Sequence, residues 1–343
     1  MGLYKNIFRH NEAIELESGA TLPSVEIVYH CSVEPIDIAE QEAQGRRVVW
    51  ICHALTANSD PSEWWSDLVG KDKLFDTKRD IIICANTLGS CYGSTCASNW
   101  SGGLFEFPLF SVRDVVACHI LLRKHLQINN IDILAGASVG GFQSLEWSIM
   151  EPNIISRLVL IACNERISPW ATALNESQRL AIEADSTFYE HKSIEGGKRG
   201  LKAARTIAML SYRSADGYNA TQSEEDDNCL EARRASTYQS YQGQKLADRF
   251  DAYAYYSMTR MLDTHNVGRK RGGVVRALAT IKARTMVIAI DSDILFPECE
   301  LRNLASLIPN AEFQTITSSF GHDGFLIEWQ AIGSILRRVL TSP

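Results

Sequence analysis

Residues 131–147 of the chain read IDILAGASVGGFQSLEW. A short apolar run ends abruptly in small residues and an amphipathic run follows at once, which predicts a strand that turns directly into a helix. Gly136, Ser138 and Gly140 place one serine in a G-x-S-x-G pattern on that turn, as in a nucleophile elbow. A side chain on such a turn has a strained backbone, and glycines two residues away on each side relieve the crowding. The alternative is a glycine-rich turn with an incidental serine, because the bare pattern often occurs by chance.

Short apolar runs recur in the first half of the chain and near its end, and they alternate with helical patterns. Strand-like runs are predicted at residues 24–33, 46–55, 80–89, 131–136, 155–164, 283–293 and 311–319. Helices are predicted at about residues 111–126, 141–150, 298–307 and 325–340. Because the strands are apolar on both faces and helices separate them, the pattern predicts an α/β fold with a mostly parallel sheet and helices on both faces.

Residues 165–280 interrupt this alternation without ending it. The stretch is charged, aromatic and mostly helical in pattern, and it contains no convincing strand. The sequence therefore predicts one α/β core formed by residues 1–164 and 281–343, with residues 165–280 inserted as a helical lid. Open α/β sheets bind ligands at the carboxyl ends of their strands, so a lid at that edge would cover the serine.

The composition is that of an ordinary globular protein, with 45% hydrophobic and 22% charged residues. A formal net charge of −7 argues against nucleic acid or an anionic membrane as a partner. No apolar run approaches the roughly 20 residues of a transmembrane helix, and the first residues lack the pattern of a secretion signal. Nine cysteines, an odd number without any C-x-x-C pair, indicate reduced thiols and a cytoplasmic location.

A nucleophilic serine needs a base, and the base needs an orienting carboxylate. In a fold of this type the chain order is serine, acid, histidine, with each partner just after a late strand. His322 fits that position, whereas His191 and His265 fall in the predicted lid and are expected on its surface. For the acid, Asp291 and Asp293 both follow a late strand. Asp291 could instead close the turn by binding backbone amides. The pattern favours Asp293 only slightly, because it lies one step further out on the loop.

Two backbone amides are candidates for an oxyanion hole. The N–H of Val139 follows the serine at the start of the predicted helix, where free amides and the helix dipole favour developing negative charge. The N–H of Leu55 lies in an early loop that leaves a predicted strand. His53, at the start of that loop, is expected to support the loop rather than to take part in the chemistry.

Further motifs along nearly the whole chain resemble those of the homoserine O-acetyltransferases, a family with the α/β-hydrolase fold. The resemblance rests on CHALTANSD (52–60), WW (64–65), GSCYGST (89–95), FSVRDVV (110–116), GASVGGFQSLEW (136–147), QRLAIEAD (178–185), YRS (212–214), YQGQKLADRFDAYAY (241–255), DSDILFP (291–297) and FGHDGFLIE (320–328). It implies Ser138 as nucleophile, Asp293 as triad acid and His322 as base. It also implies that Arg213 and Asp323 bind homoserine, whose carboxylate and ammonium require one cation and one anion.

The resemblance implies a reaction as well as a site. Acetyl would pass from acetyl-CoA to the hydroxyl of L-homoserine through an acyl-serine, with ping-pong kinetics, as a step of methionine biosynthesis. No metal and no bound cofactor would be required, because acetyl-CoA is a substrate, and the protein would be a homodimer joined through lid helices. Alternatives with the same fold are succinyl-CoA as donor, serine as acceptor, or a serine esterase. A degenerate binding module is disfavoured by the complete triad.

Two loops depart from the sequence common in that family. Ala137 and Val139 replace a glycine and a methionine in the elbow, and Cys96 and the following alanine stand where Gly-Pro is common. Both loops are expected near the acyl pocket, where they would affect the choice of donor or acceptor. Cys91 and Cys96 are expected to be small pocket-lining residues rather than reactive thiols.

Overall fold

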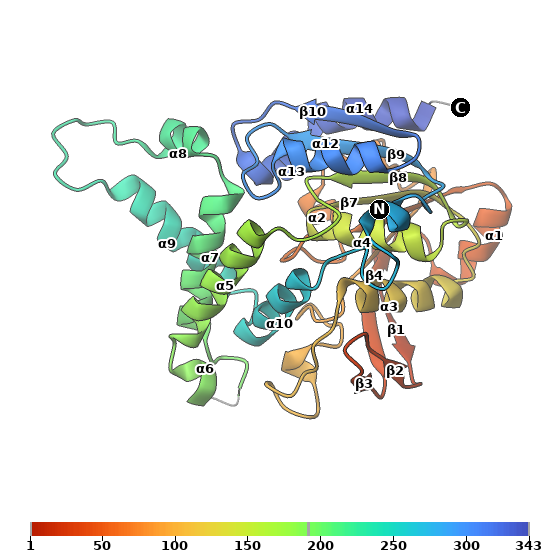
Figure 1. The fold of residues 1–343 in the computed structure, drawn as a ribbon, viewed down its shortest axis with the longest axis horizontal. Coiled ribbons are helices and arrows are strands. Elements are labelled where there is room, and N and C mark those ends of the chain that lie inside the picture. The colour runs from red at the N-terminus through yellow and green to blue at the C-terminus, as the bar shows by residue number, and fades with distance from the viewer. Residues whose placement is uncertain (1, 191–192, 342–343) are drawn as a thin grey trace.

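The seven predicted strand-like runs and one further strand, β1, which was not predicted, form one eight-stranded sheet in the computed structural model, which describes residues 2–190 and 193–341 (Figure 1). The strands lie in the order β1-β4-β6-β5-β7-β8-β9-β10. Their bounds are β1 Tyr4–His10, β4 Val25–Cys31, β5 Arg47–Cys52, β6 Asp80–Ala85, β7 Ile131–Ala137, β8 Ile155–Ile161, β9 Arg284–Ile290 and β10 Ala311–Ile316. The strands β6, β5, β7, β8, β9 and β10 pair in parallel. At one edge of the sheet, β4 pairs antiparallel with β6, and β1 pairs antiparallel with β4. A separate hairpin joins β2 (Ile14–Glu15) and β3 (Thr21–Leu22).

Helices cover both faces of the sheet. Alternate side chains of each strand point to opposite faces, so a strand of apolar residues presents apolar surface to both layers of helices. Val48 and Trp50 of β5 pack on the face covered by α3 (Val112–His125), α4 (Val139–Met150) and α12 (Glu298–Leu307). Val49 and Ile51 pack on the other face, against α14 (Trp329–Thr341). This two-sided burial confirms the predicted α/β fold class.

The described residues between β8 and β9 are mostly helical, as the sequence predicts. The helices are α5 Pro169–Glu183, α6 Thr187–Glu190, α7 Lys198–Tyr212, α8 Ala215–Gln222, α9 Arg233–Ala247, α10 Ala252–Asp263 and α11 Val274–Leu278. Figure 1 shows α7, α8 and α9 projecting away from the sheet. Within residues 2–190 and 193–341, no helix is both long and apolar enough to cross a membrane.

Shorter elements complete the chain, and one of them corrects a prediction. They are η1 Pro35–Asp37, α1 Ile38–Ala43, α2 Pro61–Trp64, η2 Ala97–Asn99, η3 Gly321–Asp323 and α13 Gly324–Ile327. The single helix predicted at residues 325–340 is wrong, because the backbone of Glu328 leaves the helical region between α13 and α14. The indole N–H of Trp65 donates to the carbonyl of Phe325 at 3.0 Å, so the short helix α13 is held by a side chain that is distant in the sequence.

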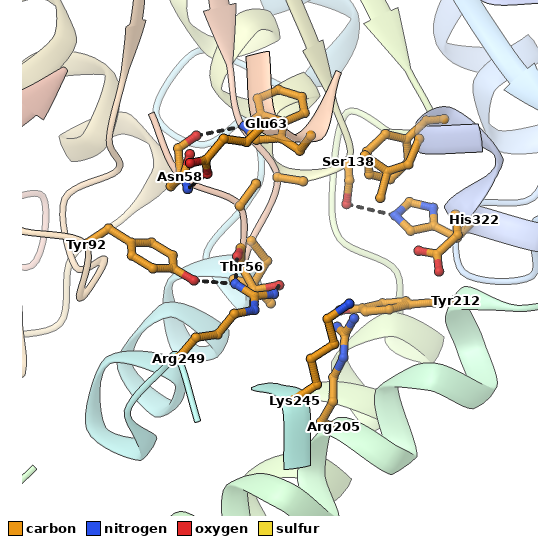
Figure 2. Close-up of a pocket in the computed structure, with 17 residues that line it drawn as sticks. Thr56, Asn58, Glu63, Tyr92, Ser138, Arg205, Tyr212, Lys245, Arg249 and His322 are labelled. Carbon is orange, nitrogen blue, oxygen red and sulfur yellow. Dashed lines mark hydrogen bonds between the residues drawn. The ribbon is translucent and has the colours of Figure 1, made fainter. Parts of the chain in front are cut away.

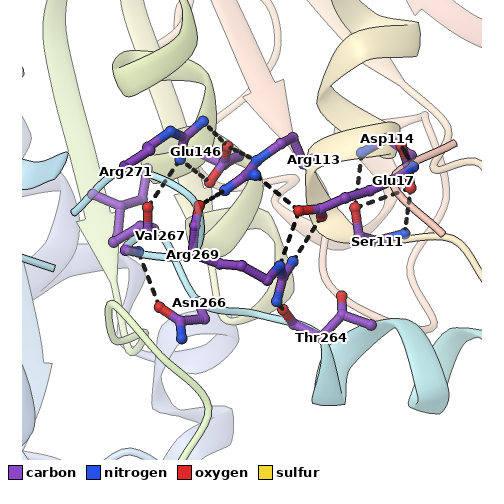
Figure 3. Close-up of polar contacts among 12 residues, drawn as sticks. Glu17, Ser111, Arg113, Asp114, Glu146, Thr264, Asn266, Val267, Arg269 and Arg271 are labelled. Atoms are coloured by element: carbon purple, nitrogen blue, oxygen red, sulfur yellow. Dashed lines mark hydrogen bonds and ion pairs between the residues drawn. The ribbon is translucent and has the colours of Figure 1, made fainter. Parts of the chain in front are cut away.

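A cluster of ion pairs joins four distant parts of the chain (Figure 3). Arg113 of α3 donates to Glu17 at 2.8 Å and to Glu146 of α4 at 2.9 Å. From the segment that returns from the helical region to the sheet, Arg269 binds Glu17 at 2.7 Å and Arg271 binds Glu146 at 2.9 Å. The two carboxylates are largely buried, so each is held by two guanidinium groups away from bulk water.

Candidate active site

Ser138 lies on the turn between β7 and α4, with φ 55° and ψ −122°, a backbone conformation that non-glycine residues seldom adopt. Its amide donates to the carbonyl of Ile161 on β8 at 2.9 Å, which helps to hold this conformation. A Cβ on Gly136 would lie 2.1 Å from the Gly140 carbonyl oxygen, and a Cβ on Gly140 would lie 2.0 Å from the Cys52 carbonyl oxygen. A side chain at position 136 would thus clash with the backbone of Gly140, and one at position 140 would clash with the backbone of β5. The serine side chain is not what requires glycine at these two positions.

The structure brings Ser138, His322 and Asp293 into one chain of hydrogen bonds. His322 Nε2 lies 2.9 Å from Ser138 Oγ, and His322 Nδ1 lies 2.7 Å from Asp293 Oδ2. These distances are those of a serine, base and orienting acid. All three side chains are buried, and the imidazole also packs among the rings of Tyr212 and Phe296 at 5.7 and 5.3 Å. An uncharged imidazole in this position can take the serine proton.

The two candidate acids have different partners. The second oxygen of Asp293 accepts from the amides of Leu295 and Phe296 at 2.8 and 3.0 Å, which fixes the carboxylate toward His322. Asp291 instead accepts from the amide of Ser318 at 3.1 Å and closes the neighbouring turn. The sequence left both roles open, and the geometry gives each aspartate one of them.

Leu55 and Val139, whose amides are the predicted oxyanion donors, both lie next to the serine. Both residues line a pocket of about 20 Å³ that Ser138 also lines. Val139 is the first residue of α4, so its N–H precedes the intrahelical hydrogen bonds. Within the described part of the chain, neither amide has a hydrogen-bond acceptor. Both are therefore available to a developing oxyanion.

His53 supports the loop that carries Leu55. Its Nδ1–H donates to the carbonyl of Ala54 at 2.8 Å, and its Nε2 accepts from the amide of Thr87 at 3.0 Å. Burial lowers the pKa of the imidazole to about 4, which keeps the ring neutral. With both nitrogens engaged, the ring is placed to hold the loop, consistent with the expected supporting role.

A cavity of about 530 Å³ opens at Ser138 and His322 (Figure 2). Its lining residues are Ala54, Leu55, Thr56, Ala57, Asn58, Glu63, Trp64, Tyr92, Ser138, Arg205, Tyr212, Lys245, Arg249, His322, Asp323, Phe325 and Leu326. The lining combines the early loop, α7, α9 and the turn of His322. A volume of this size suits a small organic molecule rather than a macromolecule.

Arg213 and Asp323 lie beside the triad as an ion pair. Arg213 Nε is 3.0 Å from Asp323 Oδ2, and Asp323 lines the cavity directly after His322. Arg213 ends α7 and does not itself line the cavity; its guanidinium lies over the ring of Phe320 at 5.6 Å. Burial raises the pKa of the Asp323 carboxyl, and the charge of Arg213 opposes this effect. The pair presents its anionic side to the cavity.

Three cationic residues of the lining were not predicted as site residues. Arg205 comes from α7, Lys245 from α9, and Arg249 follows α9. The motif YQGQKLADRFDAYAY contains two of them, but spacing within a helical segment does not reveal which side chains face a cavity formed with another part of the chain. The sequence offered no signal that separated them from ordinary surface cations.

The prediction for His265 is wrong, because this histidine is buried rather than on a lid surface. Its ring stacks on Phe142 of α4 with centroids 3.9 Å apart, and its Nε2–H donates to the carbonyl of Asn164 at 2.8 Å. Burial lowers its pKa to about 4. His265 thus packs against α4, the helix that follows Ser138. Its position in a charged segment of the sequence did not reveal this contact. His191 lies outside the described residues.

The expectation that Cys91 and Cys96 line the pocket is also wrong. Neither residue lines the cavity or the smaller pocket at Ser138. Burial raises the pKa of both thiols, to about 11 for Cys96, and the nearby carboxylate of Asp251 acts in the same direction. Thiols with raised pKa values are poor nucleophiles at neutral pH. Only their neighbour Tyr92 reaches the cavity from this loop.

A strained serine between strand and helix, joined to a late histidine and aspartate beside a mostly parallel sheet, is typical of the α/β hydrolases. In agreement, residues 47–328 match the family of the α/β hydrolase fold. The chain is 39% identical to the homoserine O-acetyltransferase of Cyclobacterium marinum, over 97% of this chain and 94% of that protein. The chain belongs to the homoserine O-acetyltransferase family.

Solved structures agree with the fold. The homoserine O-acetyltransferase of Bacillus anthracis superposes with a TM-score of 0.88 at 19% identity, covering 100% of this chain and 98% of that one. The acetyl esterase MekB superposes with a TM-score of 0.85 at 22% identity, covering 99% and 97%. One backbone thus occurs in proteins named as transferases and as esterases, so the activity must be argued from the site.

Proposed function

We propose that the chain is a homoserine O-acetyltransferase, with Ser138 as nucleophile, His322 as base and Asp293 as the acid that orients it. The observation that carries the proposal is the charged pair Arg213 and Asp323, 3.0 Å apart, next to His322. An amino-acid acceptor carries one carboxylate and one ammonium, which match this pair. An ester hydrolase, whose acceptor is water, has no need of it.

The first half of the reaction acylates the serine. His322 Nε2 takes the proton of Ser138 Oγ as that oxygen attacks the thioester carbonyl of acetyl-CoA. The amides of Leu55 and Val139 stabilise the negative charge on the carbonyl oxygen. When the tetrahedral intermediate collapses, the carbon–sulfur bond breaks and the CoA thiol leaves with the proton from His322. Asp293 stabilises the imidazolium while it carries this proton.

The second half transfers acetyl to the acceptor. The ammonium of homoserine binds Asp323 and its carboxylate binds Arg213, which opens their ion pair. The acceptor hydroxyl gives its proton to His322 Nε2 and attacks the acetyl carbon, and Ser138 leaves with that proton. This chemistry uses only protein groups, so we expect neither a metal nor a bound cofactor. The covering helices limit the access of water to the acyl-serine, which favours transfer over hydrolysis.

Acetyl is favoured over succinyl as the transferred group by the pocket beside Ser138. Its volume of about 20 Å³ is close to that of one small group. None of its lining residues carries a cationic side chain that could pair with a succinyl carboxylate. A longer and charged acyl group would have to lose its hydration there without compensation. Succinyl transfer is therefore the second candidate.

One assay separates these possibilities. Purified protein is incubated with acetyl-CoA or succinyl-CoA and with homoserine or serine, and both thiol release and product mass are followed. We expect O-acetylhomoserine and, without acceptor, an acetylated peptide that contains Ser138. Thiol release with free acetate as the main product would make the protein a hydrolase, and an adduct on a cysteine would exclude the mechanism.

We further propose that the protein acts as a homodimer joined through its lid helices. Large apolar side chains are exposed on three of these helices: Leu180 on α5, Leu210 on α7 and Tyr241 on α9. Exposed apolar groups on a projecting segment favour association. Sedimentation velocity would test this proposal. A cytoplasmic location is likewise proposed, from the cysteine content; it is supported by the burial of most thiols.

A further inference from the structure

The cavity carries positive charge that the proposed triad and acceptor pair do not use. Arg205, Lys245 and Arg249 all line it. Figure 2 shows Arg205 and Lys245 extending from the helical region toward the space beside Tyr212, and Arg249 lying next to Tyr92. Such a concentration is notable in a chain whose formal net charge is −7.

None of these three cations forms a close ion pair with a carboxylate in the described part of the chain, although the charge of Arg205 acts on Asp323 and lowers its pKa. The cavity is lined by two acids, Glu63 and Asp323. Glu63 accepts from the side-chain amide of Asn58 at 2.7 Å, and the ion-pair partner of Asp323 is Arg213. The excess positive charge in the lining is thus not neutralised by the protein itself. An anionic ligand would neutralise it.

Two of the cations are already held in place by uncharged groups. The guanidinium of Arg249 donates to the carbonyl of Thr56 at 2.6 Å and also to the hydroxyl of Tyr92. Arg205 lies over the ring of Tyr212 at 5.1 Å. Lys245 makes no hydrogen bond to the described residues, so its ammonium has all its donors available for a ligand.

We propose that Lys245, together with Arg205 and Arg249, binds the phosphate groups of the acyl donor. The assignment rests on the proposed function, in which the donor is an acyl-CoA. That molecule carries its thioester at one end and its pyrophosphate and ribose phosphate toward the other. Because Ser138 and the three cations line the same cavity, one donor molecule can reach both. Guanidinium and ammonium groups are the usual protein partners of phosphate.

Arg249 connects this phosphate site to the oxyanion loop. Its bond to the Thr56 carbonyl fixes the residue directly after Leu55. Replacing Arg249 would therefore disturb the loop of Leu55 at the reaction centre as well as the binding of the donor phosphates. Lys245 makes no such bond and is the better residue to replace.

The test compares CoA with pantetheine, which lacks every phosphate, in wild type and in Lys245→Met. Calorimetric titration measures binding of each ligand without requiring turnover. We expect Lys245→Met to weaken CoA binding about tenfold, the effect of losing one charge-assisted hydrogen bond, and to change pantetheine binding less than twofold. Lys202→Met, on α7 but outside this cavity, removes the same charge and should leave both affinities unchanged.

The same variants are then assayed with acetyl-CoA and with S-acetylpantetheine. Lys245→Met should raise the KM for acetyl-CoA about tenfold and leave the KM for homoserine within twofold. The inference is overturned if wild type binds CoA no better than pantetheine, if both donors are affected equally, or if the KM for homoserine rises instead. Phosphate-dependent binding of CoA without any acetyl transfer would uphold the inference and refute the proposed function.

Discussion

At the scale of single residues, His322 has two partners that respond differently to its loss. Asp293 keeps the amides of Leu295 and Phe296 on its other oxygen, so its charge remains stabilised without the imidazole. Ser138 keeps its backbone position but has no group to take its proton. Loss of His322 should therefore remove the proton acceptor without changing the positions of Ser138 and Asp293.

His322→Ala should therefore abolish turnover while the protein stays folded. We expect kcat to fall by roughly 10⁵ or more, as in other serine triads, with thermal unfolding close to that of wild type. Steady-state thiol release and circular dichroism measure the two quantities. Ordinary turnover by the variant would exclude His322 as the base.

Arg213→Lys tests the acceptor site. A lysine keeps the charge but cannot form the forked contact with a carboxylate, so the KM for homoserine should rise about tenfold or more. Initial rates at saturating acetyl-CoA give this value. Lys202→Arg serves as a control outside the cavity. An unchanged KM would place the carboxylate of the acceptor elsewhere.

Residue chemistry was predictable where local order and residue type decide the role. The serine, the late histidine and the two possible acids followed from the pattern alone, and the resemblance distinguished Asp293 from Asp291. Burial of His265 against Phe142 was not predictable, because it depends on how a distant segment packs on α4. The cations at the cavity were missed for the same reason.

At the scale of elements, the elbow depends on contact between β5 and the start of α4. The carbonyl of Cys52 would lie 2.0 Å from a Cβ on Gly140, and neither group is at the end of a flexible side chain. Strand and helix can therefore approach this closely only with glycine at the contact.

Gly140→Ala should destabilise the fold by about 3 kcal/mol and lower kcat as well, because α4 must shift and carry Ser138 with it. Urea unfolding and initial rates measure these effects. Gly2→Ala is the matched control, since a Cβ there meets nothing within 4 Å. Wild-type stability of Gly140→Ala would show that the contact is looser than described.

Element boundaries were predicted well where the signals are local. Helix α12 has the predicted bounds, and α3 begins after Ser111, whose hydroxyl accepts from the amide of Asp114. The break at Glu328 was missed. Next to it, the carbonyl of Phe325 accepts from the indole N–H of Trp65, a residue far away in the chain. The periodicity of apolar residues does not predict hydrogen bonds between distant parts of the chain.

At the scale of the whole molecule, the buried ion pairs of Figure 3 join the helical region to the sheet. The hydrogen bond from Arg269 is the largest cause that lowers the pKa of Glu17 from 4.5 to about 2, against the opposing effect of burial. Since the folded value is below the unfolded one, this stabilisation is fully present above about pH 4.5 and is lost as the pH falls toward 2.

Glu17→Gln should therefore reduce the free energy of unfolding at neutral pH and have progressively less effect in acid. Urea unfolding of both proteins between about pH 7 and pH 3 measures the difference. Glu15→Gln, an exposed carboxylate on the nearby hairpin, is the control. A constant difference across this range would show that Glu17 does not titrate with the fold.

Ser138 and His322 are 184 residues apart in the chain. During translation the serine leaves the ribosome first, followed by the whole helical region, and its base comes almost last. A growing polypeptide therefore carries a serine without a proton acceptor and cannot acylate itself on cellular thioesters. Synthesis proceeds at roughly 5–20 residues per second, so the reactive centre stays inactive for roughly 10 to 40 seconds and forms only when β9, β10 and the final turns have folded beside it.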